Sequence, residues 1–160
     1  MKELVAIAER IAPILVARKQ TIAVAESSTG GLISAALLAV PGASAYFKGS
    51  AVVYTREARR ILMDIPDDAM KGIRSASETY ARLLANQIRT RFSADWGLSE
   101  TGATGPTGNR YGDAAGHSCM AVAGTETSAI TLETGSSDRL WNMHEFAGTA
   151  LNLLLKELSR

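Results

Sequence analysis

A turn rich in hydroxyl groups, ESSTGG at residues 26–31, contains the residue types best suited to chemistry in this sequence. A serine hydroxyl becomes a nucleophile when its proton is removed, and free backbone N–H groups at the start of a helix can hold the resulting oxyanion. Ser27 is therefore a candidate nucleophile, and the backbone groups of residues 29–31 are candidate oxyanion donors. Small polar residues are also ordinary helix caps, so capping by Ser27, Ser28 or Thr29 is the alternative interpretation.

A second glycine-rich segment, residues 99–117, has five glycines and few apolar side chains, a composition that favours a functional loop. Both this segment and the turn at 27–31 follow a predicted strand. The carboxyl ends of strands in an open α/β sheet are where ligands usually bind, so we expect the two segments to meet there. Neither matches a P-loop or a dinucleotide fingerprint, which leaves phosphate and carboxylate recognition both open.

The elements that must position these segments alternate between helix and strand. The apolar run at 22–25 predicts a strand buried on both faces, followed by a helix from about Gly30 to Val40. Further predicted helices cover residues 2–18, 57–63, 76–92 and a C-terminal stretch capped by Ser137 or Asp138, and further strands cover 46–55, 94–98, 118–123 and 129–133. Pro13 should kink or split the first helix, and Gly49-Ser50 should mark a bulge or a close backbone approach. The pattern predicts one layered α/β domain over residues 1–160, with a mixed sheet.

Composition excludes several classes of protein. Seventeen basic and sixteen acidic residues leave a formal charge of +1, which argues against general binding to nucleic acid and against binding to an anionic membrane. The N-terminal segment is amphipathic and has neither a signal peptide's apolar run nor a membrane span, so we expect a cytoplasmic protein. Cys119 cannot form an intrachain disulfide, and its context predicts a small buried side chain. No cluster of side chains has metal-ligand spacing.

Four blocks occur in a characteristic order: AESSTGG, GSAVVYTREAR, TGATGPTG and GSSDR before the last helix. Together they resemble the C-terminal domain family of CinA, the nicotinamide-nucleotide amidases of bacterial pyridine nucleotide salvage, over nearly the whole chain. The resemblance implies a three-layer α/β/α sandwich with a mixed, mostly parallel sheet of about five strands. It also implies hydrolysis of the carboxamide of nicotinamide mononucleotide to nicotinate mononucleotide and ammonia, without a metal or another cofactor, by a protein that forms a homodimer.

By this resemblance, Ser27 is the nucleophile, and Tyr54 relays a proton or contacts the substrate. Tyr54 as a buried core residue is the alternative. The remaining residues grouped with the substrate site are Glu26, Thr29, Gly30, Gly31, Thr101, Gly102, Gly105, Pro106 and Arg139. Glu26 is expected to orient the turn by hydrogen bonding, with a plain surface or capping role as its alternative. Arg139 either pairs with phosphate or anchors the start of the last helix. Thr104 stands where the family usually has alanine.

One departure from the family pattern bears on activity. Arg59 occupies the place of the family's lysine, and an arginine stays protonated in proteins, so it cannot act as a general base. Arg59 can still bind phosphate or stabilise negative charge, and a solvated basic helix face is its alternative. Lys48 and His117 are the other residues that could reach the pocket as a base. The rival hypothesis is a family paralogue that binds a nucleotide or a protein partner without turnover.

Overall fold

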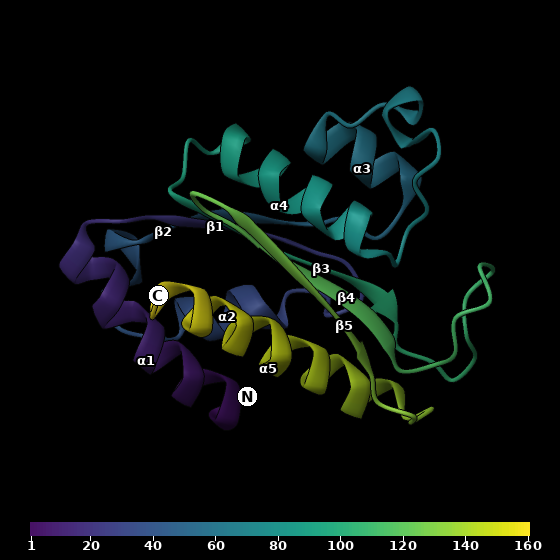
Figure 1. The fold of residues 1–160 in the computed structure, drawn as a ribbon. Helices are drawn as coiled ribbons and strands as arrows, with labels where there is room; N and C mark the ends of the chain where they lie inside the picture. Colours follow the sequence, from purple (N-terminus) through teal and green to yellow (C-terminus); the bar gives the residue numbers. More distant parts are fainter.

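A five-stranded sheet in the order β2-β1-β3-β4-β5 forms the centre of the computed structural model, which describes residues 1–160 (Figure 1). The strands are β1 (Ile22–Glu26), β2 (Phe47–Val52), β3 (Trp96–Ala103), β4 (His117–Ala123) and β5 (Thr127–Glu133). β1 pairs in parallel with β2 and β3, whereas β4 is antiparallel to both of its neighbours. β1, β2, β3 and β5 therefore point one way and β4 the other, which confirms the predicted mixed, mostly parallel sheet.

Helices cover both faces of the sheet. Figure 1 shows α1 (Lys2–Arg18), α2 (Leu32–Leu38) and α5 (Arg139–Leu158) on one face, and α3 (Arg56–Met63) and α4 (Glu78–Arg91) on the other. Two short 3₁₀ helices, η1 (Ala43–Ala45) and η2 (Asp67–Met70), lie in the connections. The arrangement is the predicted three-layer α/β/α sandwich. None of the helices combines the length and the apolar character that crossing a membrane would require.

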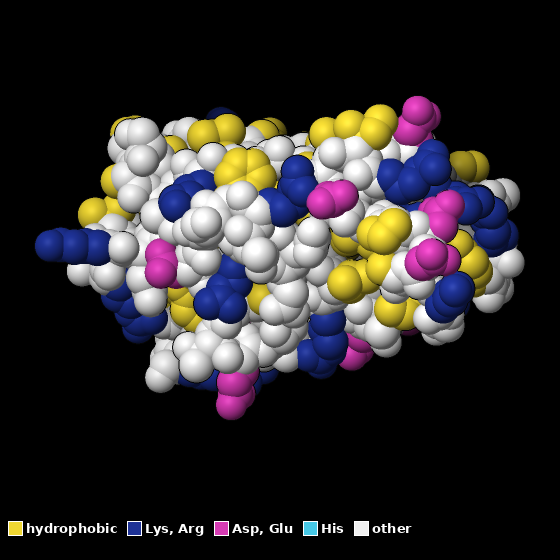
Figure 2. All heavy atoms as spheres, turned by 90° about the horizontal axis from the view of Figure 1, so that it is seen from above, with side chains coloured by type: hydrophobic (Ala, Val, Ile, Leu, Met, Phe, Trp, Pro, Cys, Tyr) yellow, Lys and Arg dark blue, Asp and Glu magenta, His cyan; other side chains and the backbone are white.

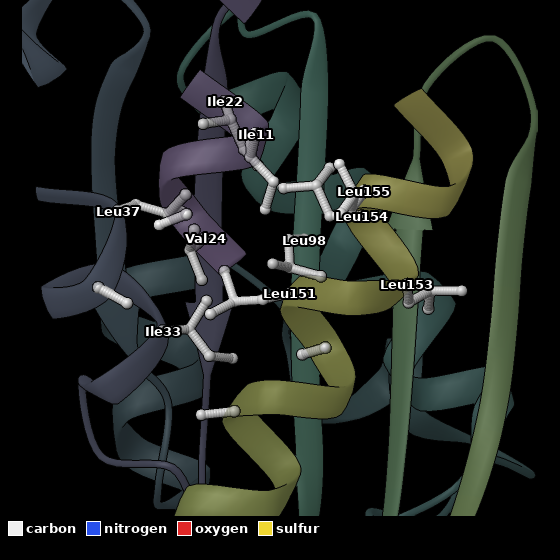
Figure 3. Close-up of a cluster of buried hydrophobic side chains, with 14 of the residues drawn as sticks. Ile11, Ile22, Val24, Ile33, Leu37, Leu98, Leu151, Leu153, Leu154 and Leu155 are labelled. Carbon is white, nitrogen blue, oxygen red and sulfur yellow. The ribbon is translucent and has the colours of Figure 1, made fainter. Parts of the chain in front are cut away.

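The largest hydrophobic core lies between the sheet and the layer of α1, α2 and α5, and it contains 23 buried residues. Figure 3 shows side chains from helices and strands converging there, among them Ile11 of α1, Val24 of β1, Leu98 of β3 and Leu151 of α5. Smaller clusters lie beneath α4 on the opposite face. β1 is buried along its whole length because both layers cover it, which explains its continuous apolar run.

Two local expectations had different outcomes. The first helix runs unbroken from Lys2 to Arg18 with Pro13 inside it, so the expectation that Pro13 would split it was wrong. The bulge near Gly49 is confirmed: Ile22 pairs with Phe47 but Ala23 pairs with Gly49, which leaves one extra residue in β2. A Cβ atom on Gly49 would lie 2.4 Å from the ring of Phe92, so the backbone also makes the close approach that was predicted there.

The strand before the glycine-rich loop is longer than its sequence suggested. β3 continues through Ala103, and Ser99–Ala103 pair with His117–Ala121 of β4, although these residues were expected to be loop. The prediction failed because residues 99–101 are polar, yet the structure buries all of them and satisfies them with internal hydrogen bonds. The loop proper is therefore residues 104–116.

Candidate active site

The turn after β1 is organised by the carboxylate of Glu26. Its Oε2 accepts a hydrogen bond from the N–H of Ile33 (3.2 Å), and its Oε1 accepts one from the N–H of Ser34 (3.0 Å). α2 begins at Leu32 after Gly31 and has no side-chain cap from Ser27, Ser28 or Thr29. The capping expectation was wrong because a fully buried glutamate takes the helix's free donors from within the protein. Glu26 therefore lies beneath the turn and does not face the solvent.

A second buried carboxyl group, Glu100 of β3, holds the same turn from below. Its Oε2 accepts from the N–H of Ser27 (3.1 Å) and the N–H of Thr29 (3.0 Å), and its Oε1 is 2.5 Å from the hydroxyl of Ser28. The N–H of Gly30 donates to the carbonyl of Ser27. The N–H of Thr29, one of the groups expected to hold an oxyanion, is therefore already bound to Glu100 in this structure. Sequence reasoning missed Glu100 because it lies in the polar segment that was assigned to the loop.

Ser27 faces a pocket of about 770 Å³, a size typical of small-molecule sites. Four further residues expected at the site also line this pocket, namely Tyr54, Arg59, Thr101 and Gly102. The others do not line it: Glu26, Thr29, Gly30, Gly31, Gly105, Pro106 and Arg139. The structure thus brings together the proposed nucleophile, the tyrosine and the arginine, while most of the expected glycine contacts shape the turns behind them.

Several lining residues escaped sequence reasoning: Arg56, Arg60, Asp67, Tyr80, Arg110 and Tyr111. Arg110 and Tyr111 come from the glycine-rich loop. An arginine beside an aromatic residue in such a loop could have indicated a binding role. Arg60 and Arg110 make no ion pair with an acidic side chain, so both can meet an anionic ligand. Figure 2 looks onto the layer of α3 and α4 and shows basic and acidic side chains mixed toward the end that carries α3.

Arg59 lies in the pocket wall and is 5% exposed. Its Nη2 forms an ion pair with Asp67, and its Nε donates to the carbonyl of Ile65 (3.3 Å). Asp67 also pairs with Arg56 (2.9 Å), and the hydrogen bond from Arg56, with the charges of the neighbouring arginines, lowers the pKa of the Asp67 carboxyl. The solvated helix face considered as an alternative for Arg59 is wrong, because the guanidinium is buried and paired.

Tyr54 follows β2 and is 64% exposed, so the alternative of a buried core tyrosine is wrong. Its hydroxyl lies 3.5 Å from Nη2 of Arg139, whose Nη1 donates to the carbonyl of Gly105 (2.6 Å). Arg139 begins α5, and Asp138 caps that helix by accepting from the N–H of Trp141. Arg139 therefore joins the glycine-rich loop to Tyr54 and the start of the last helix.

Two residues considered as alternative bases lie elsewhere. Nζ of Lys48 donates to the carbonyls of Phe92 (3.1 Å) and Ser93 (2.9 Å), away from the pocket. His117 is buried behind the pocket wall, where Nε2 is 2.8 Å from the carbonyl of Ala76 and Nδ1 contacts Glu133. Desolvation lowers the pKa of His117, but the hydrogen bonds to Glu133 and Ala76 outweigh it and raise the pKa above its ordinary value. His117 thus supports the wall and does not reach Ser27.

The hydroxyl of Ser27 is not hydrogen-bonded to a base in this structure. Oγ of Ser27 makes no hydrogen bond to another protein group, whereas the backbone N–H of the same residue is held by Glu100. The structure has no group of three or more His, Cys, Asp or Glu side chains arranged to hold a metal ion. The ionisable side chains that line the pocket beside the Ser27 hydroxyl are therefore three tyrosines, two carboxylates (Glu57 and Asp67) and four arginines.

Comparison with known proteins decides the family. The protein-family model described as "CinA C-terminal domain" matches residues 4–158 of this chain. The chain belongs to the CinA C-terminal domain family. A CinA-like protein of Gloeobacter violaceus is 37% identical over 154 residues, which cover 95% of this chain and 36% of that protein. A CinA-like protein of Acidobacterium capsulatum is 36% identical over 141 residues, covering 88% of this chain and 34% of that protein.

The chain thus spans about a third of the length of these curated CinA-like relatives. Solved CinA-family structures share its fold along nearly the whole chain. The competence or damage-inducible protein of Enterobacter asburiae superposes with a TM-score of 0.90 at 27% identity, covering 97% of this chain and 98% of that one. A CinA superfamily protein of Klebsiella pneumoniae gives a TM-score of 0.91 at 24% identity, with 98% of both chains covered.

Proposed function

We propose that this CinA-family chain is an amidohydrolase that converts nicotinamide mononucleotide to nicotinate mononucleotide and ammonia, with Ser27 as the nucleophile. The observation that carries the proposal is the common pocket: the Ser27 hydroxyl, Tyr54 and four arginines line one cavity. A nucleotide amide needs these groups, because its phosphate is anionic and its carboxamide carbon must meet a hydroxyl. Membership of the CinA family supports the same substrate class.

The unpaired guanidinium groups of Arg60 and Arg110 are suited to the phosphate, since arginine binds phosphate oxygens through a planar set of donors. The exposed ring of Tyr111, which lines the same cavity, would contact the positively charged pyridinium ring through cation–π attraction. With the phosphate and the pyridinium ring bound in this way, the carboxamide would lie next to the Ser27 hydroxyl. Thr101 and Gly102 line the same cavity and would contact the ribose or the amide.

In the proposed reaction, Oγ of Ser27 bonds to the carboxamide carbon. Tyr54 accepts the serine proton as it gives its own to the departing nitrogen, so ammonia leaves and an ester remains on Ser27. Water then attacks the ester and gives a proton to Tyr54 as Tyr54 returns its own to Oγ of Ser27, so the C–O bond to Ser27 breaks and nicotinate mononucleotide leaves. Arg139, 3.5 Å from the Tyr54 hydroxyl, would stabilise the negative charge that develops on that oxygen. The permanently protonated Arg59 takes no proton in this scheme.

A second candidate is a family paralogue that binds a nucleotide without turnover. It is favoured by the ion pair between Arg59 and Asp67, because that pair occupies the place where a neutral lysine would be needed. The absence of a hydrogen bond from Oγ of Ser27 to a basic side chain favours it as well.

The deciding experiment incubates the purified protein with nicotinamide mononucleotide and measures both ammonia and nicotinate mononucleotide. We expect turnover that Ser27→Ala and Tyr54→Phe abolish, with Lys48→Met as a control that leaves it unchanged because Lys48 lies outside the pocket. An inactive parent that gains activity through Arg59→Lys would favour a decayed amidase. If neither turns over and the nucleotide only raises the melting temperature, the binding protein is the better account.

A further inference from the structure

Two buried carboxyl groups beneath the Ser27 turn are joined through one hydroxyl. Oγ1 of Thr29 is 2.8 Å from Oε2 of Glu26 and 3.0 Å from Oε2 of Glu100, and both glutamates are 0% exposed. No lysine, arginine or histidine forms an ion pair with either carboxyl group. Two negative charges in one buried network without a cation would be strongly unfavourable, so the pair must retain a proton.

The hydrogen-bond pattern favours Glu100 over Glu26 as the carrier of that proton, although both oxygens of Glu26 also contact hydroxyl groups, those of Thr29 and Ser34. A backbone N–H reaches each oxygen of Glu26, from Ile33 to Oε2 at 3.2 Å and from Ser34 to Oε1 at 3.0 Å. A backbone N–H can only donate, so both oxygens of Glu26 must accept. These N–H groups bind a carboxylate oxygen more strongly than a protonated one, so they stabilise the charged form of Glu26.

Glu100 has a different arrangement, because its two backbone donors both reach Oε2 and come from Ser27 and Thr29. Its Oε1 meets only hydroxyl groups, those of Ser28 at 2.5 Å and Ser118 at 3.0 Å. A hydroxyl oxygen can accept as well as donate. A proton on Oε1 can therefore be donated to Ser118.

All the hydroxyl protons then have acceptors. The hydroxyl of Ser118 donates to the carbonyl of Thr101 at 3.3 Å, that of Ser28 donates to Oε1 of Glu100, and that of Thr29 donates to Glu26. Burial raises the pKa of the Glu100 carboxyl, in spite of the hydrogen bonds that lower it.

The other ionisable groups near this network are directed elsewhere. α2 has no ionisable side chain, and His117 of β4 points its ring nitrogens at Glu133 and Ala76. On α5, Arg139 binds the carbonyl of Gly105, and His144 lies 3.7 Å from Glu3. Glu26 is thus the charged group whose field acts on Glu100 at closest range.

We propose that Glu100 is an uncharged positioning residue, which carries the proton of the pair on Oε1 at neutral pH while Oε2 holds the backbone of Ser27 at the pocket. The part concerning Ser27 rests on the proposed function; the protonation state does not. The Ser27 turn needs an acceptor below it, and a neutral carboxyl supplies that acceptor without adding a second buried charge beside Glu26.

Paired amide substitutions test the assignment directly. In Glu100→Gln, the amide oxygen can accept from the N–H groups of Ser27 and Thr29 while its NH₂ group faces hydroxyls, so we expect an unfolding equilibrium constant at pH 7 no larger than that of the parent. In Glu26→Gln, either orientation places an NH₂ group against a backbone N–H, and we expect an unfolding equilibrium constant at least about tenfold larger. The reverse ranking would overturn the proposal.

Infrared spectroscopy at pH 7 provides a readout that a merely structural role would not change. We expect the C=O stretch of a protonated carboxyl group in the parent and its disappearance in Glu100→Gln; a parent without that band refutes the proposal. The stability of the parent should also depend on the protonation state of Glu100. Because the folded-state pKa of Glu100 is raised above 4.5, its contribution is complete below that pH. The parent then loses stability relative to Glu100→Gln as pH rises, by up to about tenfold in the unfolding constant per pH unit.

The positioning role is tested by Glu100→Leu, which leaves the N–H groups of Ser27 and Thr29 without an acceptor. We expect kcat to fall at least about tenfold with little change in KM, and Glu100→Gln to retain the parent's kcat. A folded Leu variant with the parent's kcat would overturn this role. If the parent has no amidase activity, the proposed function fails, whereas the infrared band and the amide pair still decide the state of Glu100.

Discussion

Replacing Arg74 with methionine should loosen the loop that brings Arg110 and Tyr111 to the pocket. The Arg74 guanidinium contacts both carboxylate oxygens of Asp113, at 2.5 and 3.0 Å, and lies 5.6 Å from the ring centre of Tyr111. Asp113 in turn accepts from the side-chain amide of Asn109 at 2.7 Å. The pairing with Arg74 lowers the pKa of Asp113, as expected for a carboxylate held by this contact.

The expected magnitude follows from the exposure of the two partners. The side chain of Asp113 is 13% exposed, but that of Arg74 is 42% exposed, so water screens the pair in part. A fully buried pair would cost about 3–5 kcal/mol to break and an exposed one less than about 1 kcal/mol, which places this contact at about 1–2 kcal/mol. The open form of the loop should therefore become about 5- to 30-fold more populated.

Hydrogen exchange measures that opening at individual backbone amides. The N–H of Tyr111 donates to Oδ1 of Asn109 at 2.9 Å, and the N–H of Asn109 donates to the carbonyl of Asp113 at 3.1 Å. Both amides should exchange faster in Arg74→Met, and affinity for nicotinamide mononucleotide should fall in parallel. Arg60→Met is the control, because Arg60 lies on α3 outside the loop and makes no ion pair, so its loss should leave exchange unchanged. Unaltered exchange in Arg74→Met would refute the reasoning.

Three further substitutions test the packing and the ionisation of residues outside the pocket. Gly97→Ala should destabilise the fold by more than about 2 kcal/mol, because a Cβ atom there would lie 2.0 Å from the carbonyl oxygen of Ala85. Gly148→Ala in α5 should stabilise the fold by about 0.5–1 kcal/mol, because the nearest atom to the added Cβ would lie at 3.5 Å. Equal effects of the two glycine substitutions on urea unfolding would contradict this packing. The parent should lose stability as pH rises above 6.5, since the raised folded-state pKa of His117 stabilises the protein only while the ring stays protonated. His117→Asn should remove this loss, and parallel curves of stability against pH for the two proteins would rule it out.

Much of the fold was accessible from the sequence because local patterns and tertiary packing agree. The first helix, at residues 2–18, was predicted with both ends correct, and the continuous apolar run of β1 indicated a strand covered by helices on both faces. The family was recognisable because four short blocks occur in one order. Arg59 stood out in the sequence alone, since the chemistry of arginine does not depend on where the residue lies.

The prediction failed where polar residues are buried. Polarity predicts exposure unless a specific partner exists, and partners distant in the sequence are not visible in it. Glu100 was assigned to a loop although it lies in the central strand, where groups from the Ser27 turn and from Ser118 of β4 satisfy it. Asp67 was overlooked for the same reason, because its importance comes from its contact with Arg59.

The sequence by itself therefore determined the elements, their layering and the identity of the hydroxyl that could act, because each depends on residue type and spacing. The tertiary structure decided which N–H groups of the turn remain free, which arginines face the pocket and which carboxyl group lies beside which. These outcomes depend on distances between segments more than 70 residues apart in the chain, as between Ser27 and Glu100. Hydrogen bonding and charge pairing act over a few ångströms in space, so only the folded arrangement determines them.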